Sequence, residues 1–267
     1  MSHKHAIYLV YALIASSMLF VASIIVFFLG YQLAIYQTAN NDTWFPHVSV
    51  TPSQPNNCIY NGTNSSPDLS TNCCYDSGQC AVALKPAIYL YPTHTQTVHV
   101  AVDFPAGFST SIPKYNTLTG WNVIAQPNGT LTNISDNKIY PYLYWEGNPQ
   151  PFNFDMTKGF IVSGNQSGAF LNKELPIIGL NKNETREFMA YWLPKLQLNT
   201  YSLIHFASSD YTNVAKLNIT PTPQSVLRVF MVEQPLTHTV PVTPQTFPTF
   251  HRSGFTAVEW GGTIKSE

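Results

Sequence analysis

A long uncharged stretch near the N-terminus limits what this chain can be more than any other feature. No charged side chain occurs from Ala6 to Asn41, and almost every residue from Ile7 to Leu29 is apolar. A helix over that run would be about 35 Å long, enough to cross a hydrocarbon core of roughly 30 Å. We therefore expect residues 1–36 to form a transmembrane-type signal-anchor helix, with the rest of the chain folded outside the membrane.

The flanking charges predict the orientation of this anchor. Lys4 is the only firm charge before the apolar run, and Asp42 is the next one after it. Cytoplasmic flanks carry Lys and Arg, so we expect an N-terminus inside and a single-pass protein exposed at the cell surface. A signal peptide cleaved near Ala22 is the alternative, although the apolar run is longer than usual for one. A pilin-like helix is a third reading, but the short basic leader with a processing-site Gly is missing.

Charged residues make up 10% of the chain, against about 25% in typical soluble domains. The net charge of −1 provides no basic field, so we expect no nucleic-acid partner. N-linked glycans would supply the missing solubility, although an Asn- and Thr-rich chain also produces sequons by chance. The sequons start at Asn41, Asn61, Asn64, Asn128, Asn133, Asn165, Asn183 and Asn218.

Residues 37–83 are rich in Asn, Ser, Thr and Pro and predict an exposed stalk. All four cysteines lie there, at Cys58, Cys73, Cys74 and Cys80. The Cys-x2-Cys pair or nearby histidines of a zinc site are missing, so we expect two disulfides and no metal. Because adjacent cysteines rarely bond each other, Cys73 and Cys74 should each pair with Cys58 or Cys80.

Residues 84–232 predict a β-rich globular domain. An aromatic strand at 87–91 precedes an alternating strand at 97–104, which we expect to be its partner. Further strands are expected at 121–125, 140–145, 159–162, 201–206, 214–219 and 226–232, with a turn at 127–130.

One strong helix signal interrupts these strands. Asn181 is a good N-cap, and Glu184 three positions later completes a capping-box pattern. An apolar stripe through Phe188 and Trp192 follows, and Pro194 should end or kink the helix. Residues 167–179 predict a weaker helix before it.

The C-terminal part, residues 233–267, predicts a Pro-rich arm and a final strand. Residues 233–250 lack a hydrophobic period and should lie extended over a surface. Residues 255–260 then predict a strand closed by Gly261 and Gly262, which could complete its own sheet or that of a neighbouring copy. We expect the intramolecular pairing.

Several motifs resemble those of an uncharacterised extracellular domain family of bacteria and fungi. The resemblance covers roughly residues 85–262 and implies a single recurrent domain with no established activity or site. The segments that carry it are Lys85–Pro92, Tyr142–Gly147, Tyr191–Leu196, Arg228–Phe230 and Gly254–Gly262.

Two carboxylates occur in aromatic settings, Glu146 and Glu259. A carboxylate pair flanked by aromatic rings is what glycoside hydrolysis requires. The structural alternative is that each carboxylate pairs with Arg228 or Lys85 to hold two strands together, which we expect to be its use. His99 and His205 lie in strand patterns and predict satisfied core histidines rather than metal ligands.

We therefore expect an α+β, β-rich domain with a mainly antiparallel sheet or sandwich and one or two helices packed on it. The expected function is that of a non-catalytic structural or adhesive surface glycoprotein without cofactors. Such a protein could assemble into a homo-oligomer or filament through the C-terminal strand or the N-terminal helix. The alternatives are a carbohydrate-active enzyme using Glu146 and Glu259, or a lectin-like binding module.

Overall fold

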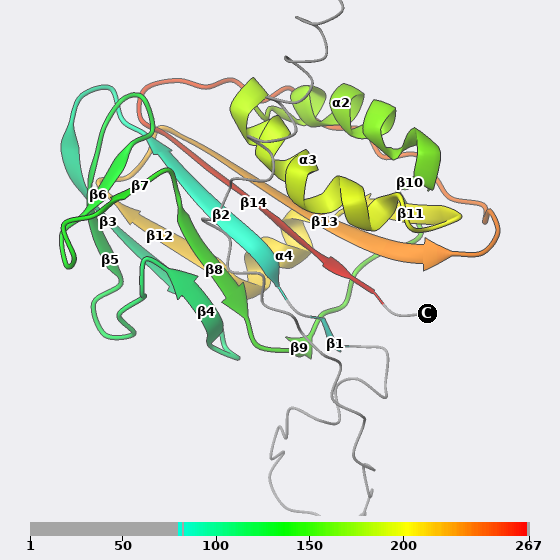
Figure 1. Cartoon of the computed structure of the whole chain (residues 1–267), viewed down its shortest axis with the longest axis horizontal. Coiled ribbons are helices and arrows are strands. Elements are labelled where there is room, and N and C mark those ends of the chain that lie inside the picture. The colour runs from blue at the N-terminus through cyan, green and yellow to red at the C-terminus, as the bar shows by residue number, and fades with distance from the viewer. Residues whose placement is uncertain (1–79, 82, 266–267) are drawn as a thin grey trace, which may run out of the picture. The chain divides into compact units, whose positions relative to one another are not determined.

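The computed structural model describes residues 80, 81 and 83–265, which belong to one compact unit (Figure 1). Most of their strands form two sheets. The seven-stranded sheet has the order β10 (Phe160–Ser163), β11 (Tyr201–Phe206), β13 (Ser225–Leu236), β14 (Thr256–Ile264), β2 (Leu84–Tyr91), β8 (Leu143–Gly147) and β4 (Phe108–Ile112). The five-stranded sheet has the order β12 (Lys216–Thr220), β3 (Gln96–Asp103), β5 (Trp121–Ala125), β6 (Leu131–Asn133) and β7 (Ile139–Tyr140). The short strands β1 (Cys80–Ala81) and β9 (Gln150–Pro151) pair with each other.

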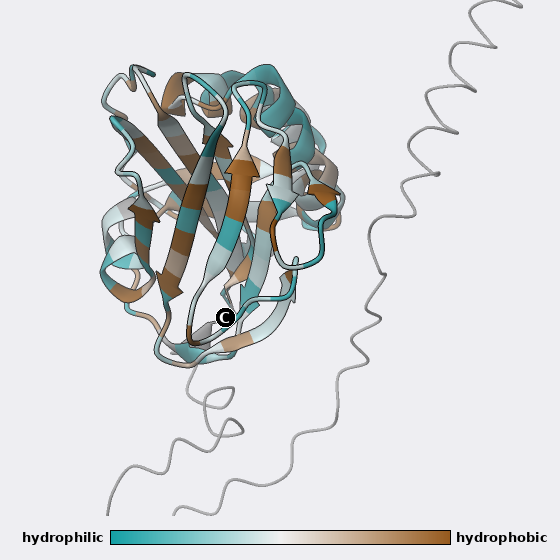
Figure 2. Cartoon of the chain, turned by 90° about the vertical axis from the view of Figure 1, so that its left-hand side faces the viewer, coloured by the Kyte–Doolittle hydropathy of each residue, from teal (hydrophilic) through white to brown (hydrophobic). Residues whose placement is uncertain are grey.

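Each face of the seven-stranded sheet is covered by a different layer, because its strands are apolar on both sides. The helices α2 (Ser167–Ile178) and α3 (Lys182–Leu196) pack on one face, where Phe188 and Trp192 join a buried cluster with Trp260. The other face forms a second core with the five-stranded sheet, around Trp121 and Trp145. In the five-stranded sheet, β3 and β5 alternate buried and more exposed residues, and the strands facing the viewer in Figure 2 carry alternating hydrophobic and hydrophilic bands, as expected for a sheet with one buried face. The expected β-rich fold with helices packed on a sheet is thus present.

The predicted pairing of the first two strands is wrong. β2 lies between β14 and β8 in the seven-stranded sheet, whereas β3 lies between β12 and β5 in the other. Hydropathy alternation predicts a strand and its buried face but does not identify its neighbour. The expected strand at 140–145 is also two strands, β7 and β8, separated at residues 141–142 around Pro141.

The C-terminal strand completes its own sheet. β14 pairs in parallel with β13 and antiparallel with β2, so both of its edges are used. β13–β14 is the one parallel pair among the described strands of the two large sheets. The expected intramolecular pairing is therefore confirmed.

The capping box that was expected at Asn181 starts α3. The Asn181 side chain accepts hydrogen bonds from the backbone N–H groups of Asn183 and Glu184, and the Glu184 carboxylate accepts one from the Asn181 backbone. Pro194 lies inside α3, which ends only at Leu196. The predicted helix before it is α2, preceded by a 3₁₀ turn at Gly164–Gln166.

One helix was not expected. Ser208–Val214 forms α4, although its sequence has little helix propensity and no apolar stripe. Tertiary packing stabilises it, because the buried Tyr211 ring stacks on Phe230 with centroids 4.0 Å apart.

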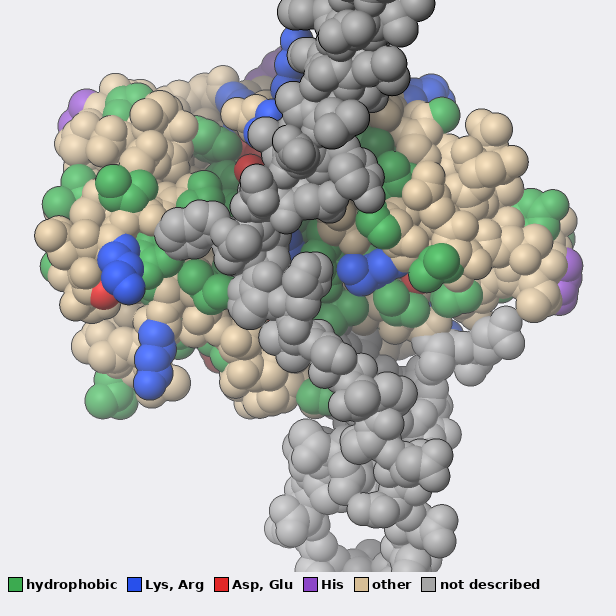
Figure 3. Space-filling model, viewed as in Figure 1, with side chains coloured by type: hydrophobic (Ala, Val, Ile, Leu, Met, Phe, Trp, Pro, Cys, Tyr) green, Lys and Arg blue, Asp and Glu red, His purple; other side chains and the backbone are tan. Residues whose placement is uncertain are grey.

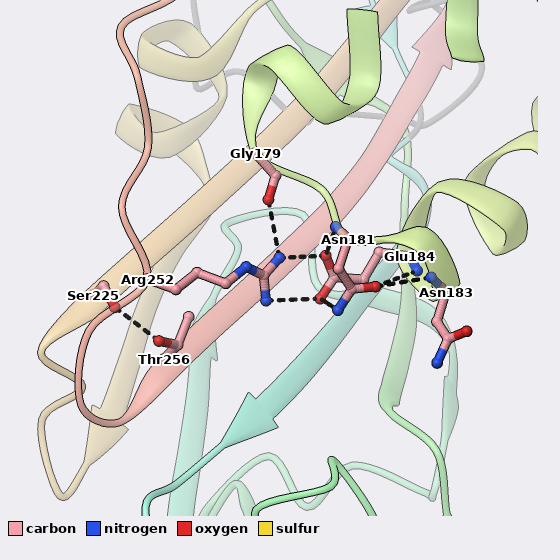
Figure 4. Close-up of polar contacts among 7 residues, drawn as sticks. All are labelled: Gly179, Asn181, Asn183, Glu184, Ser225, Arg252 and Thr256. Carbon is pink, nitrogen blue, oxygen red and sulfur yellow. Dashed lines mark hydrogen bonds and ion pairs between the residues drawn. The ribbon is translucent and has the colours of Figure 1, made fainter. Parts of the chain in front are cut away.

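The Pro-rich arm begins later than predicted, because β13 continues through Pro235 to Leu236. Residues 237–255 then return to β14 and are held by polar contacts. Arg252 donates to the Glu184 carboxylate and to the Gly179 carbonyl, and nearby Ser225 and Thr256 share a hydrogen bond of 2.8 Å (Figure 4). The arm is therefore fastened to the start of α3.

The predicted anchor and most of the predicted stalk lie outside the described residues. Within residues 80–265, apart from residue 82, no helix is long and apolar enough to cross a bilayer. The predicted disulfides also lie outside this range, except that the backbone of Cys80 belongs to β1.

Candidate functional site: a lysine–tyrosine cluster

Glu146 and Glu259 lie on opposite faces of the seven-stranded sheet. The Trp145 indole donates to Glu259 Oε1 at 3.3 Å, so both side chains face the core between the two sheets. Glu146 follows Trp145 in β8 and therefore points to the helix-covered face. A glycoside hydrolase needs two carboxylates roughly 5–10 Å apart in one cleft. The arrangement does not provide that cleft.

Glu259 instead forms a buried ion pair with Arg228. These residues are register partners in the parallel β13–β14 pair, with 2.6 Å between Arg228 Nε and Glu259 Oε2. Arg228 Nη1 also donates to the Ala215 carbonyl at 2.6 Å. Burial alone would lower the pKa of Arg228, but Glu259 and Tyr211 raise it. The Glu–Arg pair that was expected to hold two strands together is confirmed.

A different group of residues has the geometry of a functional site, and its centre is Lys85. Lys85 is 4% exposed and adopts a left-handed backbone conformation with φ of 51°, although it directly precedes Pro86. A left-handed conformation costs a residue with a Cβ roughly 1–2 kcal/mol. Strained backbone of this kind concentrates at active sites and ligand clamps.

A β-bulge lies opposite Lys85. The register between β2 and β14 shifts between Trp260 and Gly262. A Cβ at Gly261 would lie 3.0 Å from the Pro86 Cα, so a larger residue there would push against Pro86. Bulges are frequent beside active sites, where they redirect a side chain. Here the bulge belongs to the segment that turns Lys85 toward the helix-covered face.

Four aromatic rings surround the Lys85 ammonium. Its Nζ donates to the Tyr142 hydroxyl at 3.1 Å. The ring centroids lie 5.0 Å away for Tyr142, 5.2 Å for Tyr144, 5.8 Å for Tyr191 and 5.6 Å for Trp260. We call these five residues the lysine–tyrosine cluster. Its residues come from β2, β14 and α3, and from β8 and the residue directly before it. The three tyrosines are half-buried, so they reach the surface.

The charged groups around this cluster shift the pKa of Lys85 in opposite directions. Burial lowers the pKa of Lys85 to about 8, and Lys195 adds to the lowering, whereas Glu187 and Glu146 oppose it. Burial also raises the pKa of Tyr144, and a hydrogen bond to Glu146 raises it further. Burial and Glu146 likewise raise the pKa of Tyr191. The cluster therefore places an amine that is partly neutral near physiological pH among tyrosines that keep their protons.

This arrangement can bind a ligand through aromatic faces and can use the amine as a base or nucleophile. In the described part of the chain, no group of three or more His, Cys, Asp or Glu side chains is placed to hold a metal ion. In Figure 3, the charged side chains that are visible on this face lie at separate places among uncharged side chains.

Sequence reasoning found Lys85 only as a possible partner for a carboxylate. The three tyrosines entered only within the segments Tyr142–Gly147 and Tyr191–Leu196, which carry the family resemblance. All five segments that carry that resemblance meet in the seven-stranded sheet and α3. The sequence feature that could have pointed to this site is a lysine directly before a proline at the start of a buried strand.

The sequons differ sharply in accessibility. Asn128, Asn165, Asn183 and Asn218 are exposed, whereas Asn41, Asn61 and Asn64 lie outside the described residues. Asn133 is only 3% exposed, and its Nδ2 donates to Ser135 Oγ at 2.9 Å. The nitrogen that would carry the glycan is thus buried and engaged, so the expectation for Asn133 does not fit the fold.

The two strand histidines both contact backbone carbonyls. His205 is buried, and its Nδ1 lies 2.8 Å from the Lys158 carbonyl oxygen, as expected for a satisfied core histidine. His99 is half-buried, with Nε2 2.8 Å from the Thr119 carbonyl oxygen.

Comparison with known proteins yields one partial similarity. A protein of Butyrivibrio fibrisolvens described as an uncharacterised protein in the bglA 3′ region is 40% identical over 65 residues. The match covers 24% of this chain and 66% of that protein, just under two thirds of its length. No family model and no solved structure matches the chain. The similarity relates part of the chain to a bacterial protein and carries no activity with it.

Proposed function

We propose that the protein is a membrane-anchored surface glycoprotein whose β-rich domain acts as a non-catalytic structural or adhesive module of the resembled family. The observation that carries this proposal is the separation of Glu146 and Glu259 by the sheet, with Glu259 neutralised by Arg228. The uncharged N-terminal stretch and the four exposed sequons support the surface location.

Self-association, if it accompanies this function, is better assigned to the N-terminal helix than to the C-terminal strand. Both edges of β14 are already paired within the domain, so strand exchange would require opening the sheet at its centre. Removing residues 233–267 would disrupt the fold itself and could not test assembly.

Protease treatment of intact producing cells, followed by glycopeptide mass spectrometry, tests this function. We expect external protease to release the domain and glycans to occupy Asn128, Asn165, Asn183 and Asn218. Asn133 serves as the internal control and should remain unmodified. A domain that is protected on intact cells and carries no glycan would rule out the surface-glycoprotein assignment.

A lectin-like module is the second candidate function. Tyr142, Tyr144 and Tyr191 reach the surface beside Lys85, and half-buried tyrosine rings can stack against sugars while their hydroxyl groups form hydrogen bonds. Glycan-array binding of the wild type, Tyr144→Ala and Tyr201→Ala tests it. Tyr201 is a half-buried tyrosine on β11 outside the cluster, so only Tyr144→Ala should lose binding.

A further inference from the structure

We propose that the free edge of β10 is the docking site of the stalk of the same chain, and that residues 47–51 add to this edge as an extra strand. The proposal concerns how stalk and domain are joined, so it goes beyond the function above and does not depend on glycosylation. Docking would leave only residues 37–46 between the domain and the expected anchor, and this consequence alone rests on the proposed function.

The first support is the character of the edge. β10 pairs with β11 on one side, and among the described residues no strand pairs with its other side. Its sequence, Phe-Ile-Val-Ser, contains no charge and no proline, the usual protection of an exposed edge. The edge strand β12, in contrast, carries Lys216. An unprotected apolar edge is suited to receive another strand.

The backbone groups available on this edge follow from the hydrogen bonds around β10. Gly164 N–H donates to the Thr200 carbonyl at 3.3 Å, toward β11, whereas Gly159 N–H donates to the Thr243 carbonyl at 2.8 Å, on the free side. Backbone groups alternate between the two sides of a strand, so the N–H and C=O of Ile161 also point to the free side. No described residue forms a backbone hydrogen bond with them there.

The arm covers the start of this edge and then leaves it. Thr243 lies beside Lys158 in a single parallel bridge. Pro244 follows and has no N–H with which to continue the pairing. Gln245 then binds the backbone of Phe206 in β11, accepting from its N–H at 2.8 Å and donating to its carbonyl at 3.2 Å. The edge beyond Gly159 is therefore open to a different segment.

An open groove of about 510 Å³ runs beside this edge, and its shape favours a single extended segment. Residues 159–162 line it together with Phe170 and Glu174 of α2 and with Val240 and Pro244 of the arm. One strand fits between a helix and an arm, whereas the sheet edge of a second copy would bring its own helix and arm into the same space. In such strand addition, backbone hydrogen bonds provide affinity and alternate side chains fill the groove.

The sequence before the described domain contains a segment with the required pattern. Residues 47–51, His-Val-Ser-Val-Thr, alternate polar and β-branched apolar side chains between Pro46 and Pro52. The rest of residues 37–79 contains no second run of this kind. Val48 and Val50 would both point into the apolar groove, because side chains two positions apart lie on one face of a strand.

The tether makes this segment a better occupant than a free peptide. The 28 residues 52–79 could span up to about 90 Å, and a domain of this size is about 40 Å across. The expected disulfides would shorten that span, although residues 52–57 would still reach about 20 Å beyond Cys58. A tethered segment acts at an effective concentration of about millimolar, without a second molecule.

Hydrogen–deuterium exchange of the full chain in detergent tests the docking. Peptides covering residues 159–164 should exchange at least tenfold faster in the double variant Val48→Asp/Val50→Asp than in the wild type, because two carboxylates would be placed in the apolar groove. Ser49→Asp is the matched control, since its side chain points away from the groove, and its rates should stay within twofold of the wild type. Unchanged exchange over β2 and β14 in both variants would show that the domain itself remains folded.

A photo-cross-linking side chain at position 49 identifies the occupant. We expect a cross-link to residues 160–163 within one chain, located by peptide mass spectrometry at the mass of the monomer. Cross-links to β10 only between two chains, no cross-link to β10, or equal exchange over residues 159–164 in all three proteins would each overturn the proposal. Neither readout depends on glycans or on exposure at the cell surface, so such a result would leave the proposed function unaffected.

Discussion

Arg252 Nη1 donates to Glu184 Oε1 at 3.1 Å, and this contact joins the arm before β14 to the first turn of α3. Glu184 has no exposed surface, yet it serves both the capping box and the arm. The Glu184 carboxylate therefore both caps α3 and holds the arm that contains Arg252.

Replacing Arg252 should loosen the arm more than the core. In Arg252→Ala, Glu184 keeps its capping bonds but loses its cation, so we expect the free energy of unfolding to fall by about 1–3 kcal/mol. Hydrogen exchange should accelerate over residues 237–255. Arg186→Ala on the exposed side of α3 is the matched control and should change stability by less than about 0.5 kcal/mol. Equal effects of both substitutions would contradict the role of this contact.

The Arg228–Glu259 pair predicts strong coupling in a double-mutant cycle. Arg228→Met or Glu259→Gln alone should each cost about 3–5 kcal/mol, because either change leaves an uncompensated group in the core between the sheets. The double variant should lose far less free energy of unfolding than the sum of the losses in the two single variants. Lys173→Met, in a pair whose lysine is 74% exposed, should cost under about 1 kcal/mol. Additive urea-denaturation energies for the buried pair would show that the pairing is unimportant.

Lys85 predicts how stability depends on pH. Its pKa is lower in the folded protein, about 8, than the ordinary 10.5, so between these values the unfolded chain holds a proton that the folded protein has released. Between pH 8 and 10.5, the contribution of Lys85 to the free energy of unfolding therefore rises by up to about 1.4 kcal/mol per pH unit. This gain is lost again as the pH falls toward 8. Above about pH 10 the tyrosines with raised pKa act in the opposite direction.

Lys85→Met isolates this contribution. The variant should lack the rise in stability between pH 8 and 10, so the difference in unfolding free energy between it and the wild type should change with pH in that window. Urea denaturation at pH 7, 8, 9 and 10 measures the difference. A pH-independent difference would show that Lys85 has an ordinary pKa.

Gly262 predicts a severe packing defect when it is substituted. A Cβ there would overlap the Met231 carbonyl oxygen and lie 2.6 Å from the Trp192 ring, both in the buried centre of the domain. Gly262→Ala should cost several kcal/mol by overpacking and backbone displacement. Gly168→Ala in α2 meets nothing closer than 3.7 Å and should stabilise the protein by roughly 0.5–1 kcal/mol through helix propensity. Thermal unfolding of the two variants should therefore shift in opposite directions.

Local signals in the sequence predicted the elements better than their arrangement. The capping box at Asn181 and the aromatic run of β2 depend on neighbouring residues, so they could be predicted. The separation of β2 and β3 into different sheets depends on β14, which lies more than 150 residues further along. α4 could not be foreseen, because Tyr211 is buried by contacts that its local sequence does not encode.

The candidate site was hidden for a related reason. The ion pair between Glu259 and Arg228 followed from charge scarcity, because few partners were available to a carboxylate in this domain. The lysine–tyrosine cluster lies beside the left-handed backbone of Lys85 and the register shift between Trp260 and Gly262, and neither feature could be predicted from the sequence. Hydropathy gives no information on the sign of φ at a single residue.

The central position of β14 also affects how the protein can be made. Chains emerge from a ribosome or a translocation channel N-terminus first, so β2 and β13 are both available before Thr256–Ile264 has been delivered. Until then the edges of β2 and β13 that will receive β14 have no partner, and such edges invite pairing with other chains. The seven-stranded sheet can close only after Ile264 has emerged, so the domain should stay unfolded until this last strand has been delivered.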